Sequence, residues 1–430
     1  MTASQESGVA APAPTPNKTS QGVKRLFRRA FEPFWVIPAM WCIGALIAGV
    51  LVPSLDSTLS QYVPLLFQAG PEGARTFLSS IAGAMISVTG LVFSITIVVL
   101  QLASSQFSPR VLRTFLDERV PQFTLGIFTA SYVYALTLMR SVAGTPVDGA
   151  SSVPQIGVTI SFLLVLLSVG IFLAFIHHIT QAISVDTIIQ TVGKETGLLL
   201  KRSAKAREES STLTNGIEEQ RGAAHTVVSP TGGYLNYVDA HGLISLAEKH
   251  VVHIELLHPL GTYLVENEPM AIVHGGTDHP SVDWGKKISQ EMEVGWRRTM
   301  EQDISFGLRQ LVDIADKALS PGVNDPTTAI QVIDQLHTLL ADLAPRVDPS
   351  PARTDSQGTT RLTMAKWGFG DVLDLCVDEI AHWGASSIQV PRRLDLMLEQ
   401  LSATASPKHR EALEEKRFQV AQKANSAQSA

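Results

Sequence analysis

The chain has 430 residues, of which 45% are hydrophobic and 17% are charged, and its formal net charge is -6 at pH 7. Soluble domains are usually about one-quarter charged, so this composition is typical of a protein that lies partly in a membrane. The negative charge gives no basis for nucleic acid as a partner. Two cysteines, one of them within an apolar segment, exclude a disulfide framework.

Four apolar segments dominate the first part of the chain. Each reaches the roughly 20 residues that a helix needs to cross a bilayer, and only Arg140, at the edge of the third, is charged. Residues 1–23, rich in Ala, Pro, Ser and Thr, are predicted to be a disordered N-terminal tail. Residues 24–182 are predicted to form the transmembrane domain. Its four predicted spans are residues 34–55, 77–103, 123–142 and 153–176.

Basic residues in the short loops predict the orientation of these spans. They precede the first span and separate the second from the third, whereas the other short loops carry few. Positive charge is retained on the cytoplasmic side, so both termini are expected in the cytoplasm. The residues that carry this argument are Lys24, Arg25, Arg28, Arg29, Arg110, Arg113 and Arg119.

The texture of the sequence changes after the membrane part. Residues 183–222 are predicted to be a helical extension and linker. Residues 223–280 hold short β-rich runs broken by Gly and Pro and are predicted to form a small β-rich module. Residues 281–401 show helical periodicity and are followed by a C-terminal tail, residues 402–430. The predicted fold class is therefore an α-helical integral membrane protein with four transmembrane helices and a cytoplasmic α+β domain.

The second span carries small and polar residues at helical spacing, so they share one face of a helix. Such a face must contact protein or water, because lipid satisfies no polar group. Two interpretations stay open: close packing between helices, and the lining of a pore built by several copies. Thr89 and Thr96 lie on the opposite face. The residues of this face are Ser80, Gly83, Ser87, Gly90, Ser94 and Gln101.

Two further groups of residues are candidates for regulation. If the helix after residue 300 and the following turn fold back, Arg298 and Asp303 approach Asn324 and Asp325 to form a pocket for an anion or small ligand. The alternative is a capping network with Asp325 as the N-cap of the next helix. His177 and His178, at the cytoplasmic end of the fourth span, form a pH sensor or are simply solvated.

The sequence contains no recognisable signature of a metal site or of an enzyme. Seven of the twelve histidines lie between His225 and His279, but no spacing matches a zinc site, so no metal is predicted. The sequence has no Walker loop, dinucleotide fingerprint, nucleophile elbow or two-histidine zinc helix. We therefore predict no cofactor and no enzymatic activity.

Two stretches resemble a known family. They are SVTGLVFSITIVVLQLASSQFSPRVL, which begins in the second span and continues past it, and RRTMEQDISFGLRQLVDIADKALSPGVNDPTTAIQVID, in which ALSPGVNDPTTA is the specific marker. From about Arg25 to Leu401 the chain resembles the bacterial predicted-membrane-protein family called domain of unknown function 2254. The resemblance implies the fold and a location in the bacterial inner (plasma) membrane, and implies no activity.

The functional expectation follows from the second span. Proton-driven carriers usually place an acid or base at mid-membrane, and the predicted spans have none there. We expect a homo-oligomeric channel or pore for ions or a small ligand, lined by the second span and assembled or gated by the cytoplasmic domain. One alternative is a membrane-anchored sensory or scaffold protein without transport, and another is a membrane-bound enzyme with a cytosolic site.

Overall fold

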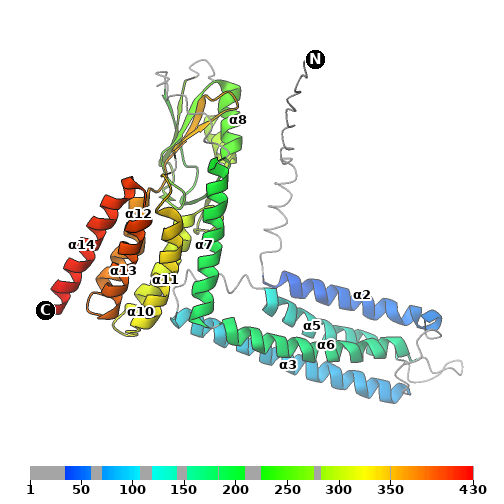
Figure 1. The fold of residues 1–430 in the computed structure, drawn as a ribbon. Helices are drawn as coiled ribbons and strands as arrows, with labels where there is room; N and C mark the ends of the chain where they lie inside the picture. Colours follow the sequence, from blue (N-terminus) through cyan, green and yellow to red (C-terminus); the bar gives the residue numbers. More distant parts are fainter. Residues whose placement is uncertain are drawn as a thin grey trace, which may run out of the picture. The chain divides into compact units, whose positions relative to one another are not determined.

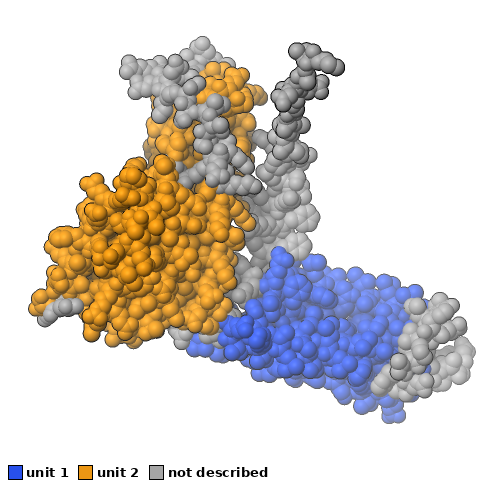
Figure 2. Space-filling view, viewed as in Figure 1, with its two compact units in different colours: residues 1–103, 112–182 blue, residues 104–111, 183–430 orange. Residues whose placement is uncertain are grey.

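The computed structural model describes residues 34–59, 70–106, 119–142, 153–182, 184–208, 224–275, 282–348 and 350–429. The chain divides into two compact units (Figure 2). The first unit comprises residues 1–103 and 112–182, and the second comprises residues 104–111 and 183–430. The predicted N-terminal tail and most of the basic residues used to orient the spans lie outside the described residues.

The first unit contains four long helices, all drawn in the blue-to-green part of Figure 1. Each is long and apolar enough to cross a membrane. They overlap the four predicted spans and extend most of them at the ends, so the prediction of four transmembrane helices is confirmed. The helices are α2 (Val36–Leu59), α3 (Pro71–Gln106), α5 (Arg119–Met139) and α6 (Gln155–Ala182).

Helix α5 is the centre of this bundle. In the most apolar 18-residue stretch of α5, 61% of the residues are buried, whereas in the corresponding stretches of α2, α3 and α6 the buried share is 17% or less. Tyr134 and Leu138 of α5 pack with Leu78 of α3 and Val158 of α6. The Tyr134 hydroxyl donates to the Gly157 carbonyl oxygen over 3.3 Å. Polar groups inside the bundle therefore find protein partners, as a low-dielectric interior requires.

Glycines allow the closest helix contacts in this unit. A Cβ atom added to Gly126 of α5 would lie 2.7 Å from a ring carbon of Trp41 in α2, and one added to Gly157 of α6 would lie 2.6 Å from a methyl group of Leu138. Real Cβ atoms essentially never approach so closely. Small residues thus bring α2, α5 and α6 together, in the manner expected where lipid provides no hydrophobic drive for packing.

The second unit begins with α7 (Val185–Glu208), which is the predicted helical extension. It continues with eight described strands in two sheets, whose orders are β1-β5-β3-β8-β7 and β4-β2-β6. Strands β3 and β8 are parallel, and the other pairs are antiparallel. The strands are β1 (Ala224–Val228), β2 (Gly233–Val238), β3 (His253–Leu256), β4 (Tyr263–Leu264), β5 (Pro269–His274), β6 (Met292–Gly295), β7 (Ala352–Thr354) and β8 (Thr360–Met364).

The sheets extend beyond the predicted β-rich module, residues 223–280. Strands β6, β7 and β8 come from the region predicted to be helical, and β8 pairs with β3 across about one hundred residues of sequence, with Ile254 opposite Leu362. These strands have only three to five residues. Runs this short carry little periodicity, and nothing local indicates a partner so distant in sequence. The two helices packed with the sheets are α8 (Ala240–His250) and α9 (Trp284–Gln290).

Five helices complete the second unit, and α7 packs against α10 and α11 (Figure 1). A Cβ atom added to Gly307 of α10 would collide with the Thr196 hydroxyl of α7, so the two backbones approach closely. The predicted helical domain is therefore extended by α7. The five helices are α10 (Ile304–Leu319), α11 (Pro326–Leu343), α12 (Phe369–Trp383), α13 (Gln389–Thr404) and α14 (Pro407–Ser429).

The prediction of a C-terminal tail over residues 402–430 is wrong for most of that segment. Residues Pro407–Ser429 form α14, which packs against α12 and α13. Leu413 and Val420 are buried, and the Lys416 ammonium group lies 2.6 Å from Asp374 and 2.7 Å from Asp378 of α12. The sequence hides this helix because few apolar residues mark its buried face, and because part of its attachment is ionic.

Candidate functional site

The small and polar residues of α3 lie on the face that points away from the rest of their unit. Leu78, Met85 and Val92 on the other side of α3 are buried in the bundle. With 3.6 residues per turn, the two sets fall on opposite faces of the helix. All six predicted residues are exposed: Ser80, Gly83, Ser87, Gly90, Ser94 and Gln101.

The contacts of these residues show whether this face of α3 packs against another helix of the same chain. A Cβ atom added to Gly83 or Gly90 would meet no described atom within 4 Å. The hydroxyls of Ser87 and Ser94 donate to the carbonyl oxygens four residues earlier, over 3.0 and 2.9 Å. Among the described residues, therefore, this face packs against no other helix of its own chain. Thr96 faces the other way and is buried.

His177 and His178 lie in the last two turns of α6. His177 is exposed, its Nε2 atom is 3.2 Å from the side-chain amide nitrogen of Gln181, and His178 is half-buried. Neither is part of a described group of three or more metal-binding side chains. Their predicted role as a pH sensor stays a prediction.

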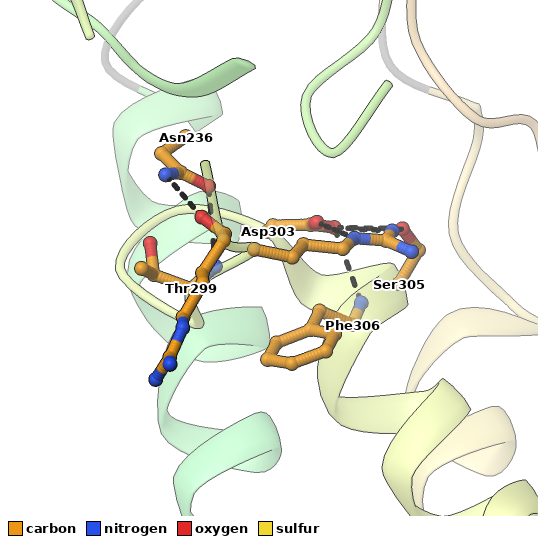
Figure 3. A network of polar contacts seen from close by, with 7 residues as sticks. Asn236, Thr299, Asp303, Ser305 and Phe306 are labelled. Carbon is orange, nitrogen blue, oxygen red and sulfur yellow. Dashed lines mark hydrogen bonds and ion pairs between the residues drawn. The ribbon is translucent and has the colours of Figure 1, made fainter. Parts of the chain in front are cut away.

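In the second unit, Arg298 forms an ion pair with Asp303, the N-cap of α10, which Figure 3 shows beside Ser305 and Phe306. The Arg298 Nε atom lies 2.5 Å from Asp303 Oδ2, and its terminal nitrogen donates to the Ser305 hydroxyl over 2.6 Å. Asp303, which is 2% exposed, also caps the helix by accepting from the Phe306 amide over 3.1 Å. A buried carboxylate with this many donors is held rigidly and is fully compensated.

Asn236 of β2 fixes the segment that leads to this pair. Its side-chain amide donates to the Arg297 carbonyl oxygen over 2.6 Å, and its carbonyl oxygen accepts from the Thr299 amide over 3.2 Å (Figure 3). Gly261, with φ of +84°, presses against the Arg298–Asp303 pair so closely that a Cβ atom would collide with both side chains. The sheet β4-β2-β6 is thereby joined to the start of α10.

The other two residues of the predicted pocket lie at the far end of α10. Its 16 residues span roughly 24 Å at 1.5 Å per residue. Asp325 accepts from the Thr327 and Thr328 amides, each over 3.1 Å, as the N-cap of α11. The Thr328 hydroxyl and these amides lower the pKa of the Asp325 carboxyl. Asn324 adopts a left-handed turn, with φ of 48°. The structure thus forms two separate capping groups instead of one pocket.

The histidine-rich strands bring two histidines together across the sheet. His253 of β3 and His274 of β5 are register partners whose rings stack at 5.6 Å. Burial and the neighbouring His274 lower the pKa of His253, and its Nε2 atom is 2.8 Å from the Thr363 hydroxyl of β8. His274 lies 2.9 Å from Glu255. Among the described residues, which do not include His279, no group of three or more metal-binding side chains occurs.

A cluster that the sequence did not indicate lies between α10 and α12. The Arg309 guanidinium contacts Asp313 over 2.7 Å and binds Glu379 in a two-point pair over 2.5 and 2.7 Å. Asp316 is 3.8 Å from the same guanidinium. Burial and the hydrogen bond with Glu379 raise the pKa of Asp316 to about 8. The i, i+4 pair within α10 is visible in the sequence, whereas the contribution of Glu379 requires the fold.

Four long apolar helices followed by an α+β region define an integral membrane protein. The family model described as predicted membrane protein, domain of unknown function 2254, matches residues 32–400, and the chain belongs to this family. An uncharacterized protein of Mycobacterium bovis and one of Mycobacterium tuberculosis are each 33% identical over 380 residues, covering 86% of this chain and 71% of the relative. No solved structure matches.

Proposed function

We propose that the protein is an oligomeric channel or pore of the plasma membrane, in which α3 lines the path and the second unit assembles or gates it from the cytoplasm. The observation that supports this proposal is the exposure of the predicted small and polar face of α3, which finds no partner among the described residues of its own chain. This face needs a neighbour other than lipid.

Lipid is a poor neighbour for this face. A hydrocarbon environment offers no partner to the Gln101 amide, and a buried amide without a hydrogen bond costs several kcal/mol, about 4–8 for transfer to an alkane. Copies of the same helix around a central axis would place these groups against water. The absence of charged residues over 77–103 favours a passive path over proton-driven transport.

Cysteine substitution tests this assignment on the whole protein. In a background carrying Cys42→Ser and Cys376→Ser, a water-soluble charged thiol reagent should label Ser94→Cys in membranes. Phe93→Cys is the matched control, because Phe93 is exposed on an apolar flank of the same helix and should contact lipid. Equal protection of both positions would contradict an aqueous path.

One observation favours the alternative of a membrane-anchored sensory or scaffold protein. The serine hydroxyls already donate to their own helix, so this face of α3 also suits dry packing against a second copy. In that case Ser94→Cys would form disulfide-linked dimers on oxidation and would resist the water-soluble reagent. Cross-linking together with labelling supports the channel.

A further inference from the structure

The second unit contains a cavity of about 190 Å³ whose walls come from segments far apart in the sequence. They are the C-terminal half of α7, the loop before β4, the start of α10, the end of α11, the segment between β8 and α12, and the start of α14. The wall is mostly apolar. Its principal apolar and aromatic residues are Leu260, Leu343, Met364, Trp367, Phe369 and Val372.

The aromatic lining and the volume of the cavity favour a small aromatic ligand. Phe369 and His409 stack with a ring-centroid distance of 4.3 Å, and Trp367 also lines the cavity. A protein cavity of about 150 Å³ holds one benzene molecule. The 190 Å³ available here therefore suits one ring with a substituent of a few atoms.

The charged residues of the wall indicate which chemical group the aromatic ring of the ligand carries. Two acids line the cavity, but both are already compensated: Asp303 by Arg298, and Asp348 by Lys408, whose Nζ atom lies 2.9 Å away. Two cations also line the cavity: Lys366, whose Nζ atom donates to the Ser350 carbonyl oxygen over 3.1 Å, and Arg346, which is one-third exposed. Among the described residues, the carboxylate in an ion pair with Arg346 is that of Asp342, at 3.8 Å. A loosely paired guanidinium beside an apolar cavity is a site for a carboxylate, which it can bind through two hydrogen bonds.

We propose that this cavity binds a small aromatic carboxylate, with its ring against Trp367 and Phe369 and its carboxylate on Arg346. The assignment goes beyond the proposed conduction and does not depend on it, because binding is measured directly. Leu200 and Ser203 of α7 also line the cavity. A bound ligand would therefore contact the helix that follows the last membrane span in sequence.

Phenylacetate, 2-phenylethanol and 2-phenylethylamine test the proposal as anionic, neutral and cationic probes of nearly equal size. The full chain in lipid nanodiscs should bind phenylacetate saturably by calorimetry, one per chain and at least tenfold more tightly than either other probe. Its Trp fluorescence should change on binding, and Trp367→Phe should abolish the change. Absence of saturable phenylacetate binding, or equal affinity for all three probes, would overturn the proposal.

Variants locate the binding. Arg346→Gln should weaken phenylacetate binding about tenfold, whereas Arg392→Gln, an exposed arginine of α13 that does not line the cavity, should leave it unchanged. Leu260→Trp should fill the cavity and abolish binding. Thermal melting of each variant checks that it is folded. Unchanged binding in folded Leu260→Trp protein would place the ligand elsewhere.

Discussion

At the scale of single residues, the buried carboxylates of the second unit differ in how many hydrogen-bond and ion-pair partners they have. Asp303 is buried with a full set of donors, and these contacts fix the start of α10. Asp316 shares the single guanidinium of Arg309 with Asp313 and Glu379. Burial, followed by the hydrogen bond with Glu379 and the charge of the neighbouring carboxylates, raises the pKa of Asp316 to about 8. We therefore expect the Asp316 carboxyl to make the free energy of unfolding depend on pH near neutrality.

The Asp316→Asn variant should remove this dependence. In the unfolded chain the Asp316 carboxyl loses its proton near pH 4, whereas in the folded protein it holds the proton up to about pH 8. Its contribution to stability therefore falls as pH rises from about 4 to 8, since the unfolded state binds fewer protons in that range. At pH 8.5 we expect Asp316→Asn to be more stable than the wild type by roughly 1–2 kcal/mol, after allowance for partial exposure.

Thermal unfolding of the reconstituted protein at pH 5.5 and pH 8.5 measures this difference. Glu411→Gln, which changes an exposed acid of α14, is the matched control and should behave as the wild type. An unchanged pH dependence in Asp316→Asn would show that Asp316 does not carry the effect.

Residues that act within one helix end are the ones that the sequence predicts well. Asp325, followed by Pro326, has the sequence signature of an N-cap, and its carboxylate accepts hydrogen bonds from two backbone amides. The pairing of Arg309 with Glu379 joins residues seventy positions apart. The Arg346 cavity likewise needs α7, β8 and α14 in place. No local pattern carries such information, because each partner is an ordinary surface residue until the chain folds.

At the scale of helices, the bundle contains two kinds of glycine that the sequence alone does not distinguish. Gly126 lies against Trp41 inside the bundle, whereas Gly90 faces away from all described atoms. Both sit in apolar helices among small residues. The length and hydropathy of the spans are predictable because lipid imposes them, but which face meets a neighbouring helix depends on the tertiary arrangement.

The pair Gly126→Ala and Gly90→Ala separates these roles. Gly126→Ala should destabilise the protein by roughly 1–3 kcal/mol, the usual cost of overpacking, since the Trp41 ring must move. Gly90→Ala should leave the stability of the single chain unchanged within about 0.5 kcal/mol, and should weaken association between copies. Thermal unfolding and cross-linking of both variants check this. Equal destabilisation by both would contradict the assignment of inner and outer faces.

At the scale of the whole molecule, the chain combines a membrane bundle with a larger second unit. The bundle is centred on α5 and keeps a small and polar face of α3 exposed. The second unit joins its sheets to its helices through the Arg298–Asp303 network and contains the cavity. The sequence predicted the four spans and the α+β class, whereas the cavity and α14 emerge only from the folded chain.

Ion flux through liposomes containing the full chain tests the central proposal most directly. We expect flux well above that of empty liposomes, a decrease of at least tenfold in Ser94→Leu and in Gln101→Leu, and no change in Thr180→Leu, an exposed polar residue of α6. Flux that does not exceed that of empty liposomes from a folded oligomer, or equal flux in Ser94→Leu and the wild type, would contradict a path lined by α3.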